Sequence, residues 1–257
     1  MCELFGVSAK GKIQVNSLLK EFFSHSEKHP HGWGLAVFYE NAVSLEKEPV
    51  CASESAYLKE RLRHKVEVRA MIAHIRMATK GTPEYENCHP FVKRDNFERT
   101  WTLAHNGTIF QYPALNPYVY TQEGRTDSER ILCYFTDKIN ERQEELGRPL
   151  DKAERFELLD GLICEMSKGN KLNLLVYDGE LMYVHCNYAD TLYVCQTGEA
   201  ALFATVPLDH SRWKPLPFTT LCAYEKGQKK FEGTNHGNEY KDNEKNTRLL
   251  FVDFSEL

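Results

Sequence analysis

The segment NLLVYDGELMYVH, residues 173–185, constrains the fold most, because Asp178-Gly179 joins two apolar runs there. An Asp-Gly pair between alternating apolar residues is a strong signal for a tight β-hairpin. The aromatic-rich segment GWGLAVFYENAVSLEKE, residues 32–48, also alternates and predicts a second hairpin. Hairpins join neighbouring antiparallel strands, so we expect antiparallel sheets.

Other segments predict more strands and four amphipathic helices. The further strands are expected over residues 3–8, 68–81, 101–110, 191–197, 201–209, one or two within 213–227, and 249–254. The helices are expected over residues 16–29 with Asn16 as N-cap, 52–66, 151–168, and behind Thr126, which forms a capping box with Glu129. The polar segment 229–246 predicts a solvated loop. Strands in hairpin groups and helices in pairs indicate an α+β fold with helices on the outer faces of the sheets.

Composition narrows the class of protein. The chain has 257 residues, 42% hydrophobic and 27% charged, as in an ordinary folded protein. It shows no repeat and no linker, so we expect a single domain over residues 1–257. The net charge of -5 offers no basic surface and excludes nucleic acid and anionic membranes as main partners. Because no apolar run spans a bilayer and no N-terminal signal is present, a cytoplasmic location is expected.

The eight cysteines are scattered, with no CxxC and no zinc-type spacing. In a cytosolic protein they are expected to be free thiols, largely buried as small hydrophobic residues, and no metal site is expected. Cys2 stands out by position alone. If Met1 is removed, the Cys2 thiol lies beside a free α-amine that can act as its base. Frequency alone favours a buried structural cysteine, so other clusters must decide.

The segment AHIRMATKG places Arg76 at the end of an apolar strand. A guanidinium there can hold a carboxylate through two parallel hydrogen bonds, although a lone arginine more often forms a surface ion pair. Thr79 and Lys80 are candidates to supplement such a carboxylate pocket. His74, inside the strand, is interpreted as a hydrogen-bonded core residue.

Two more clusters have both a structural and a functional interpretation. Asn106-Gly107, in AHNGTI, is typical of a hairpin turn, yet the amide and the glycine N–H can also form an oxyanion hole. Asp127, in GRTDSERI, complements a helix dipole, and it can also bind a substrate ammonium group. A nucleophile, an oxyanion hole, a carboxylate clamp and an ammonium acceptor together describe a site for a γ-glutamyl group.

The chain resembles the class II glutamine amidotransferase domain of the N-terminal nucleophile hydrolases, and within it the stand-alone subgroup. The resemblance covers essentially the whole chain, in the family's order. It rests on MCELFG, HGWGLAVFYE, AHIRMATKG, NCHPF, AHNGTI, TDSERI and ATVPLDHSRWKP. It implies a four-layer αββα sandwich, two antiparallel sheets between helix layers.

The resemblance also implies residue roles. Cys2 is then the nucleophile with its own α-amine as base, Asn106 and Gly107 the oxyanion hole, Arg76 the α-carboxylate clamp and Asp127 the partner of the α-ammonium group. Met77 and Lys80 depart from the tryptophan and histidine common in sugar-linked members, which affects the carboxylate pocket and its covering loop. No second domain that consumes ammonia is expected within residues 1–257.

The expected activity is cleavage of a γ-glutamyl amide through a Cys2 thioester, releasing glutamate and ammonia or an amine. No metal or organic cofactor is required. One alternative is a γ-glutamyl peptide hydrolase that acts alone, and another is a non-catalytic protein with a glutamate pocket if Met1 is retained. Expected partners are a small-molecule substrate and, for ammonia transfer, a separate synthase subunit; a homo-oligomer is compatible with the sequence. The HPHGWG turn, residues 29–34, receives no role.

Overall fold

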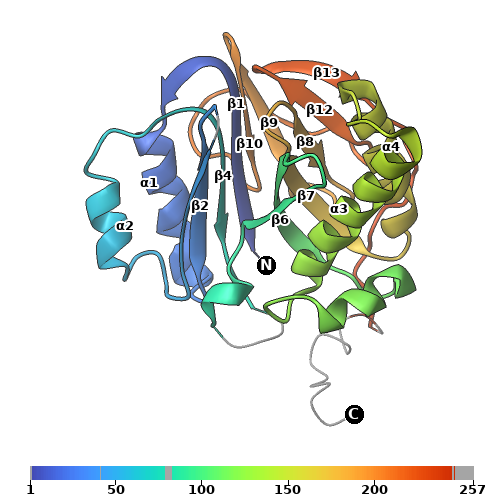
Figure 1. Cartoon of the computed structure of the whole chain (residues 1–257). Helices are drawn as coiled ribbons and strands as arrows, with labels where there is room; N and C mark the ends of the chain where they lie inside the picture. Colours follow the sequence, from blue (N-terminus) through green and yellow to red (C-terminus); the bar gives the residue numbers. More distant parts are fainter. Residues whose placement is uncertain (1, 41, 79–82, 245, 247–257) are drawn as a thin grey trace.

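The computed structural model describes residues 2–40, 42–78, 83–244 and 246. In this part of the chain, two antiparallel sheets lie face to face, and helices cover their outer faces (Figure 1). Sheet 1 has the strand order β11-β9-β10-β1-β4-β2-β3, and sheet 2 the order β13-β12-β8-β7-β6-β5. The expected four-layer αββα sandwich is therefore confirmed.

The element bounds are as follows. Sheet 1 contains β1 (Glu3–Gln14), β2 (Trp33–Phe38), β3 (Val43–Glu48), β4 (Glu67–Ile75), β9 (Tyr193–Thr197), β10 (Ala200–Ala204) and β11 (Trp213–Pro215). Sheet 2 contains β5 (Phe91–Arg94), β6 (Thr100–Thr108), β7 (Lys171–Tyr177), β8 (Met182–His185), β12 (Cys222–Glu225) and β13 (Gln228–Glu232). The α-helices are α1 (Asn16–Ser24), α2 (Ala56–Arg61), α3 (Asp127–Leu146) and α4 (Lys152–Met166). Short 3-10 helices cover His25–Lys28, Tyr85–Asn87 and Pro113–Tyr120.

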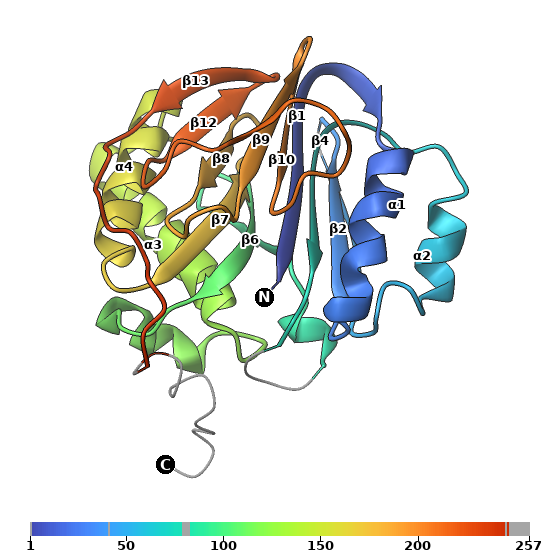
Figure 2. The ribbon, with the colours of Figure 1, turned by 180° about the vertical axis from the view of Figure 1, so that it is seen from behind.

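Three hydrophobic cores separate the four layers. One packs α1 and α2 on sheet 1, a second packs α3 and α4 on sheet 2, and the third fills the space between the sheets (Figures 1 and 2). β1 shows how one strand serves two cores. Phe5 belongs to the helix side of sheet 1, and Leu4 to the core between the sheets, because successive side chains point to opposite faces.

Local signals placed most elements correctly, with corrections at some ends. Val15, not Asn16, is the N-cap of α1, and the Asn16 side chain instead bonds the backbone near Val66. α2 is shorter than predicted, because the Ser55 hydroxyl caps it by accepting from the Leu58 N–H. The Asp178-Gly179 hairpin between β7 and β8 is confirmed.

The hairpin turn predicted at Asn106-Gly107 is wrong. Both residues lie inside β6, where Asn106 pairs with Asn173 and Gly107 with Leu172 of β7. The backbones approach closely there, and a Cβ at position 107 would clash with the carbonyl oxygen of Lys171. Glycine is therefore required for close strand packing rather than for a turn.

The C-terminal region also differs from the prediction of a solvated loop over residues 229–246. Its first residues pair with β12 as β13, and Tyr240 is 6% exposed. The strand expected at residues 249–254 lies outside the described residues. The capping box at α3 is half formed: Thr126 accepts from the Glu129 N–H, whereas the Glu129 carboxylate accepts from the N–H groups of Glu123 and Gly124.

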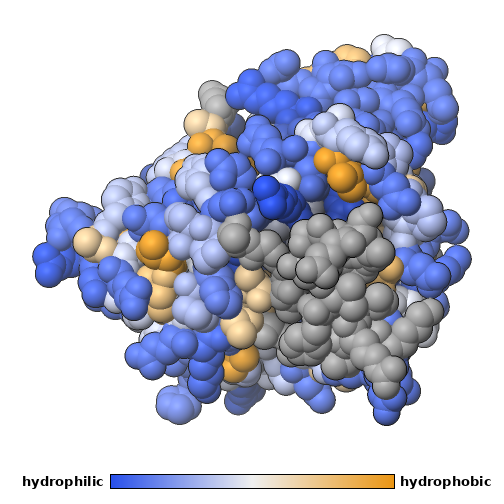
Figure 3. All heavy atoms as spheres, turned by 90° about the horizontal axis from the view of Figure 1, so that it is seen from below, coloured by the Kyte–Doolittle hydropathy of each residue, from blue (hydrophilic) through white to orange (hydrophobic). Residues whose placement is uncertain are grey.

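Figure 3 shows the end of the molecule at which β1 begins. The coloured surface there is mainly hydrophilic, with separate hydrophobic patches. Among the described residues, no helix combines the length and apolar character needed to cross a bilayer. All eight cysteines are free thiols, and six of them are buried, as expected for small hydrophobic residues.

Candidate active site

Cys2, Arg76 and Asn106 meet at one end of the layer between the two sheets. Cys2 directly precedes β1 and has the same strand parity as Leu4, which lies in the core between the sheets. Asn106 shares its parity in β6 with Ala104 of the same core. Arg76 directly follows β4, whose last residue pairs with the first residue of β1. Strand ends from both sheets therefore direct these side chains to one place.

The three residues line one cavity of about 340 Å³, and Gly107 and Asp127 line it too. The structure thus brings together five of the six residues that the sequence nominated. A cavity of this size between packed layers is typical of a small-molecule site.

The Cys2 thiol is held by the backbone of Met77. The Met77 N–H donates to Sγ at 3.3 Å, and the thiol donates to the Met77 carbonyl oxygen at 3.5 Å. Burial raises the pKa of the Cys2 thiol, and the Met77 hydrogen bond and the nearby Arg76 charge only partly offset that effect. The thiol is therefore protonated at neutral pH, and it requires a base to become a nucleophile.

The HPHGWG turn positions Arg76. The Arg76 N–H donates to the Gly32 carbonyl oxygen at 2.8 Å, and the Arg76 carbonyl oxygen accepts from the His31 N–H at 3.1 Å. Gly32 has φ of 138°, and a Cβ there would lie 2.6 Å from the Cys88 sulfur. Only glycine suits this backbone conformation and this space. No role for this turn follows from the sequence; in the structure it fixes the backbone of Arg76, which is 4% exposed.

Asn106 offers a hydrogen-bond donor to the cavity. Its side chain is 2% exposed, and its Nδ2 finds no hydrogen-bond partner within the described part of the chain. Leaving a buried amide N–H unpaired costs free energy, so native proteins rarely do so without a reason. A ligand oxygen in the cavity would supply the missing acceptor.

Asp127 is the first residue of α3, and its carboxylate is oriented by the backbone. Oδ2 accepts from the Ile109 N–H at 2.7 Å, and Oδ1 lies 3.3 Å from the Ser128 hydroxyl. The carboxylate therefore lies at the cavity wall with one oxygen anchored. Its charge is suited to an ammonium group.

The Ser128 hydroxyl contacts both His105 and Asp127. His105 Nε2 lies 3.1 Å from the Lys171 carbonyl oxygen, which only accepts, so Nε2 carries the hydrogen. Burial lowers the pKa of His105, which is therefore neutral, and its Nδ1 accepts from the Ser128 hydroxyl at 3.0 Å. The same hydroxyl lies within hydrogen-bond distance of Asp127 Oδ1, so its single proton is shared between the two acceptors. Because a carboxylate oxygen has two lone pairs, Asp127 Oδ1 can also accept a hydrogen bond from a ligand.

Glu3, the first residue of β1, anchors this strand on the face of sheet 1 opposite to Cys2. Its carboxylate lies 2.8 Å from His25 Nδ1 and 3.2 Å from His29 Nε2. Burial alone would raise the pKa of Glu3, but the hydrogen bonds to the two histidines outweigh it and lower the pKa. Residues 2 and 3 therefore point into different layers, and the second of them is firmly held.

Sequence reasoning does not find four further residues of the cavity lining. These are Lys171, Tyr188, Tyr240 and Asp242, from the start of β7, the loop after β8 and the C-terminal segment. The signal for this part of the lining is Tyr240, an aromatic residue in a mainly polar stretch that predicts a solvated loop.

Three residues that the sequence singles out lie outside the part of the chain that the structure describes. Thr79, Lys80 and Met1 are outside the described residues, so the role of Thr79 in substrate binding stays a prediction. Within residues 2–40, 42–78, 83–244 and 246, no three His, Cys, Asp or Glu side chains gather as metal ligands would.

The chain is similar to known proteins in family, sequence and structure. The family model described as "Glutamine amidotransferases class-II" matches residues 1–198. An uncharacterized protein of Methanocaldococcus jannaschii is 30% identical over 256 residues, covering 89% of this chain and 70% of that protein. YafJ of Escherichia coli is 29% identical over 190 residues, covering 73% of each chain.

Two solved structures share the fold at low sequence identity. A predicted glutamine amidotransferase from Pseudomonas aeruginosa has a TM-score of 0.60 at 21% identity, covering 89% of this chain and 99% of that one. The glutamine phosphoribosylpyrophosphate amidotransferase of Bacillus subtilis has a TM-score of 0.67 at 17% identity, covering 91% of this chain and 49% of that one. Since the family model matches well over half of the sequence, this chain belongs to the class II glutamine amidotransferases.

Proposed function

We propose that this protein cleaves the amide bond of a γ-glutamyl compound through a thioester on Cys2. The observation that carries the proposal is the buried Asn106 amide: its Nδ2 has no partner among the described residues, and Asn106 lines the same cavity as Cys2. A donor kept without an acceptor beside a nucleophile suits the oxyanion of acyl transfer.

The first half of the reaction forms the thioester. After removal of Met1, the α-amine of Cys2 takes the thiol proton, and the thiolate attacks the γ-carbonyl carbon. Negative charge on the carbonyl oxygen is stabilised by Asn106 Nδ2 and the Gly107 N–H. Arg76 holds the α-carboxylate and Asp127 the α-ammonium group, which fixes the γ-carbonyl at the sulfur.

The second half releases the products. The C–N bond breaks, and the leaving amine takes its proton from the α-ammonium group of Cys2. Water then hydrolyses the thioester to glutamate and restores the thiol. Residues 1–257 are proposed to act as one glutaminase-type unit, which delivers ammonia or an amine to solvent or to a separate synthase subunit.

The test compares two forms of the protein that differ only at Met1. We expect the form that begins at Cys2 to release glutamate from glutamine or a γ-glutamyl amide. Acid quenching followed by peptide mass spectrometry should detect a γ-glutamyl adduct on Cys2. The form that retains Met1 should lose turnover, because its Cys2 nitrogen is an amide and cannot accept a proton.

Two outcomes would contradict the proposal. Equal turnover by both forms would exclude the α-amine as the base. Binding of glutamate without turnover of any γ-glutamyl amide by the form that begins at Cys2 would favour the non-catalytic alternative.

A further inference from the structure

The γ-glutamyl group accounts for only part of the cavity. Cys2, Arg76, Asn106, Gly107 and Asp127 are used by that group in the proposed reaction. The lining also includes a second wall, formed by Lys171, Tyr188, Tyr240 and Asp242. An ammonia leaving group would need none of these side chains.

Lys171 places a positive charge on this wall. It is the first residue of β7, opposite Thr108 and next to the strand pair that contains Gly107. Its side chain is largely buried, and its Nζ lies 3.6 Å from the centre of the Tyr188 ring. Such a position favours a cation through the electrons of the ring.

The protonation state of Lys171 suits an anionic ligand at neutral pH. Burial lowers the pKa of Lys171 to about 8, and the negative charge of Asp242 acts in the opposite direction. Most Lys171 side chains are therefore ammonium groups at pH 7.

Aromatic rings extend the wall. The Tyr188 hydroxyl donates to Asp242 Oδ2 at 2.5 Å, and the Tyr188 ring meets the Tyr240 ring edge-on, with centroids 5.7 Å apart. Tyr240 in turn stacks on Phe110, with an interplanar angle of 6°. The wall thus combines the Lys171 ammonium group with aromatic rings, while its Asp242 carboxylate already accepts from Tyr188, and it suits an organic group whose negative charge can reach Lys171.

The segment that carries Tyr240 is held in place by its backbone. The Tyr240 N–H donates to the Asn187 carbonyl oxygen at 2.7 Å, and Asn187 Nδ2 donates to the Asn238 carbonyl oxygen at 3.0 Å. Farther back, the His236 N–H donates to the Thr219 carbonyl oxygen at 3.1 Å. The wall is therefore formed before any ligand binds, which reduces the entropy lost on binding.

We propose that Lys171, Tyr188 and Tyr240 form a subsite for the leaving group, and that the preferred leaving group is an amine that carries a carboxylate, such as an amino acid. This inference rests on the proposed function. Lys171 takes no part in bond making: the γ-glutamyl C–N bond breaks, the Cys2 thioester forms, and the amine leaves with the proton from the Cys2 α-ammonium group. The role of Lys171 is a charge-assisted hydrogen bond to the carboxylate of that amine.

The test compares two substrates that differ mainly in this carboxylate. γ-Glutamylglycine releases glycine, and γ-glutamylmethylamide releases methylamine, in which a hydrogen replaces the carboxylate. The wild-type kcat/KM should be higher for γ-glutamylglycine. In Lys171→Met, the ratio of the two kcat/KM values should fall by about 10- to 100-fold, the range expected for a hydrogen bond to a charged group.

Lys168→Met is the matched control, because Lys168 is an exposed lysine three residues earlier, and it should keep the wild-type ratio. An unchanged ratio in Lys171→Met would overturn the subsite. If Lys171→Met does not fold, the test rests on the wild type alone. A wild-type kcat/KM for γ-glutamylglycine that is no higher than that for γ-glutamylmethylamide would then overturn the subsite. Turnover of neither substrate by wild type would overturn the proposed function itself, which distinguishes the two failures.

Discussion

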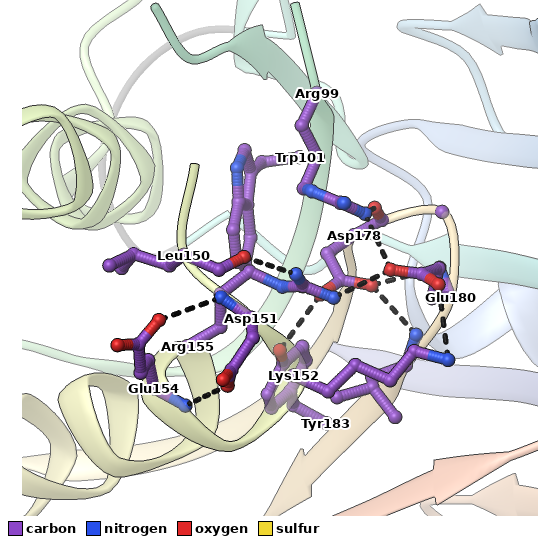
Figure 4. Close-up of polar contacts among 12 residues, drawn as sticks. Arg99, Trp101, Leu150, Asp151, Lys152, Glu154, Arg155, Asp178, Glu180 and Tyr183 are labelled. Atoms are coloured by element: carbon purple, nitrogen blue, oxygen red, sulfur yellow. Dashed lines mark hydrogen bonds and ion pairs between the residues drawn. The ribbon is translucent and has the colours of Figure 1, made fainter. Parts of the chain in front are cut away.

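Two buried polar clusters of this protein differ in how completely their groups are paired. In the first, Arg155 of α4 is 1% exposed and every guanidinium nitrogen donates (Figure 4). Nε donates to Asp178 at 2.7 Å, Nη1 to the Leu150 carbonyl oxygen at 2.8 Å, and Nη2 to Glu180 at 2.8 Å. Asp178 also accepts from the Tyr183 hydroxyl at 2.8 Å. This cluster fastens α4 to the turn between β7 and β8.

The cluster around Cys2 is less enclosed and incompletely paired, because Asn106 is buried whereas Cys2 and Asp127 are half-buried. Asn106 Nδ2 has no partner among the described residues, and Asp127 Oδ1 keeps acceptor capacity beside the Ser128 hydroxyl because a carboxylate oxygen has two lone pairs. A saturated cluster contributes to folding, whereas a cluster with unused capacity is prepared for a ligand. Substitutions should therefore affect stability in the first cluster and activity in the second.

The largest expected effect is that of Cys2→Ala on turnover. Removal of the nucleophile should lower kcat by about 10⁴-fold or more. The free energy of unfolding should change little, because a thiol is a weak hydrogen-bond partner. Glutamate release and urea denaturation check the two parts. Cys164→Ala, at a half-buried thiol of α4, is the control and should keep both values. Turnover by Cys2→Ala would show that Cys2 is not the nucleophile, and the cluster around it would then have no functional role to set against the Arg155 cluster.

Arg155→Ala should produce the largest loss of stability. It leaves the buried Asp178 carboxylate without its main partner, which costs about 3–5 kcal/mol of unfolding free energy. Urea denaturation measures the loss. Arg94→Ala, which breaks an exposed ion pair with Glu98, should cost less than about 1 kcal/mol. Equal values for the two variants would contradict a structural role for the Arg155 cluster.

Asn106→Asp tests the unused donor while keeping the shape of the side chain. Loss of one oxyanion donor should lower kcat by about 10²- to 10³-fold. Asn106→Ala should show a similar loss, because both variants lack the amide N–H. Steady-state kinetics on a γ-glutamyl amide measure it. Retention of full turnover in both variants would exclude Asn106 from the oxyanion hole.

The histidines near the site should make stability depend on pH. Burial lowers the pKa of His74 to about 3, so below about pH 6.5 the unfolded chain binds a proton that the folded chain does not. The contribution of His74 to the free energy of unfolding is therefore fully present above pH 6.5, and it is lost toward pH 3 by at most about 1.4 kcal/mol per pH unit. Denaturation experiments between pH 6.5 and 4.5 should show that the free energy of unfolding falls less steeply with decreasing pH in His74→Gln than in the wild type.

The exposed His64→Gln variant is the control for this slope and should follow the wild type. A His74→Gln protein with the wild-type pH dependence would show that His74 takes up its proton without loss of the fold. The measurement thus tests whether the fold tolerates a protonated histidine at position 74.

Ser128→Ala is expected to have the smallest effect, because Ser128 acts through Asp127. Without the hydroxyl, His105 Nδ1 loses its donor and the Asp127 carboxylate is less well oriented, so KM should rise about 2- to 10-fold with a smaller change in kcat. Ser128→Thr keeps a hydroxyl and should restore KM. A fall in kcat at constant KM would assign Ser128 a different role.

Local sequence signals predicted the elements whose structure depends on neighbouring residues. The Asp178-Gly179 hairpin was predicted because two residues determine the turn. Asn106-Gly107 carries the same kind of signal and forms no turn, because pairing with Asn173 and Leu172 keeps it in a strand. Long-range pairing overrode local preference at the position where the proposed site needs a side-chain amide.

The site was predictable where strand ends and a helix start carry reactive side chains. Arg76 and Asp127 lie at such positions. Lys171 and Tyr240 were not predicted, because Lys171 reaches the cavity through the pairing of β7 with β6, and Tyr240 through a segment after β13 that is held by Asn187. No spacing along the chain encodes that contact.

The contacts of the Glu3 carboxylate with His25 and His29 have a consequence for the removal of Met1. The first residues of a chain usually fray, and a nucleophile at the very end would spend much of its time away from its target. Here His25 and His29 hold the neighbouring side chain, and β1 pairs with β4 from residue 3 onward. Excision of Met1 would therefore expose a new terminus that is already immobilised one residue inward.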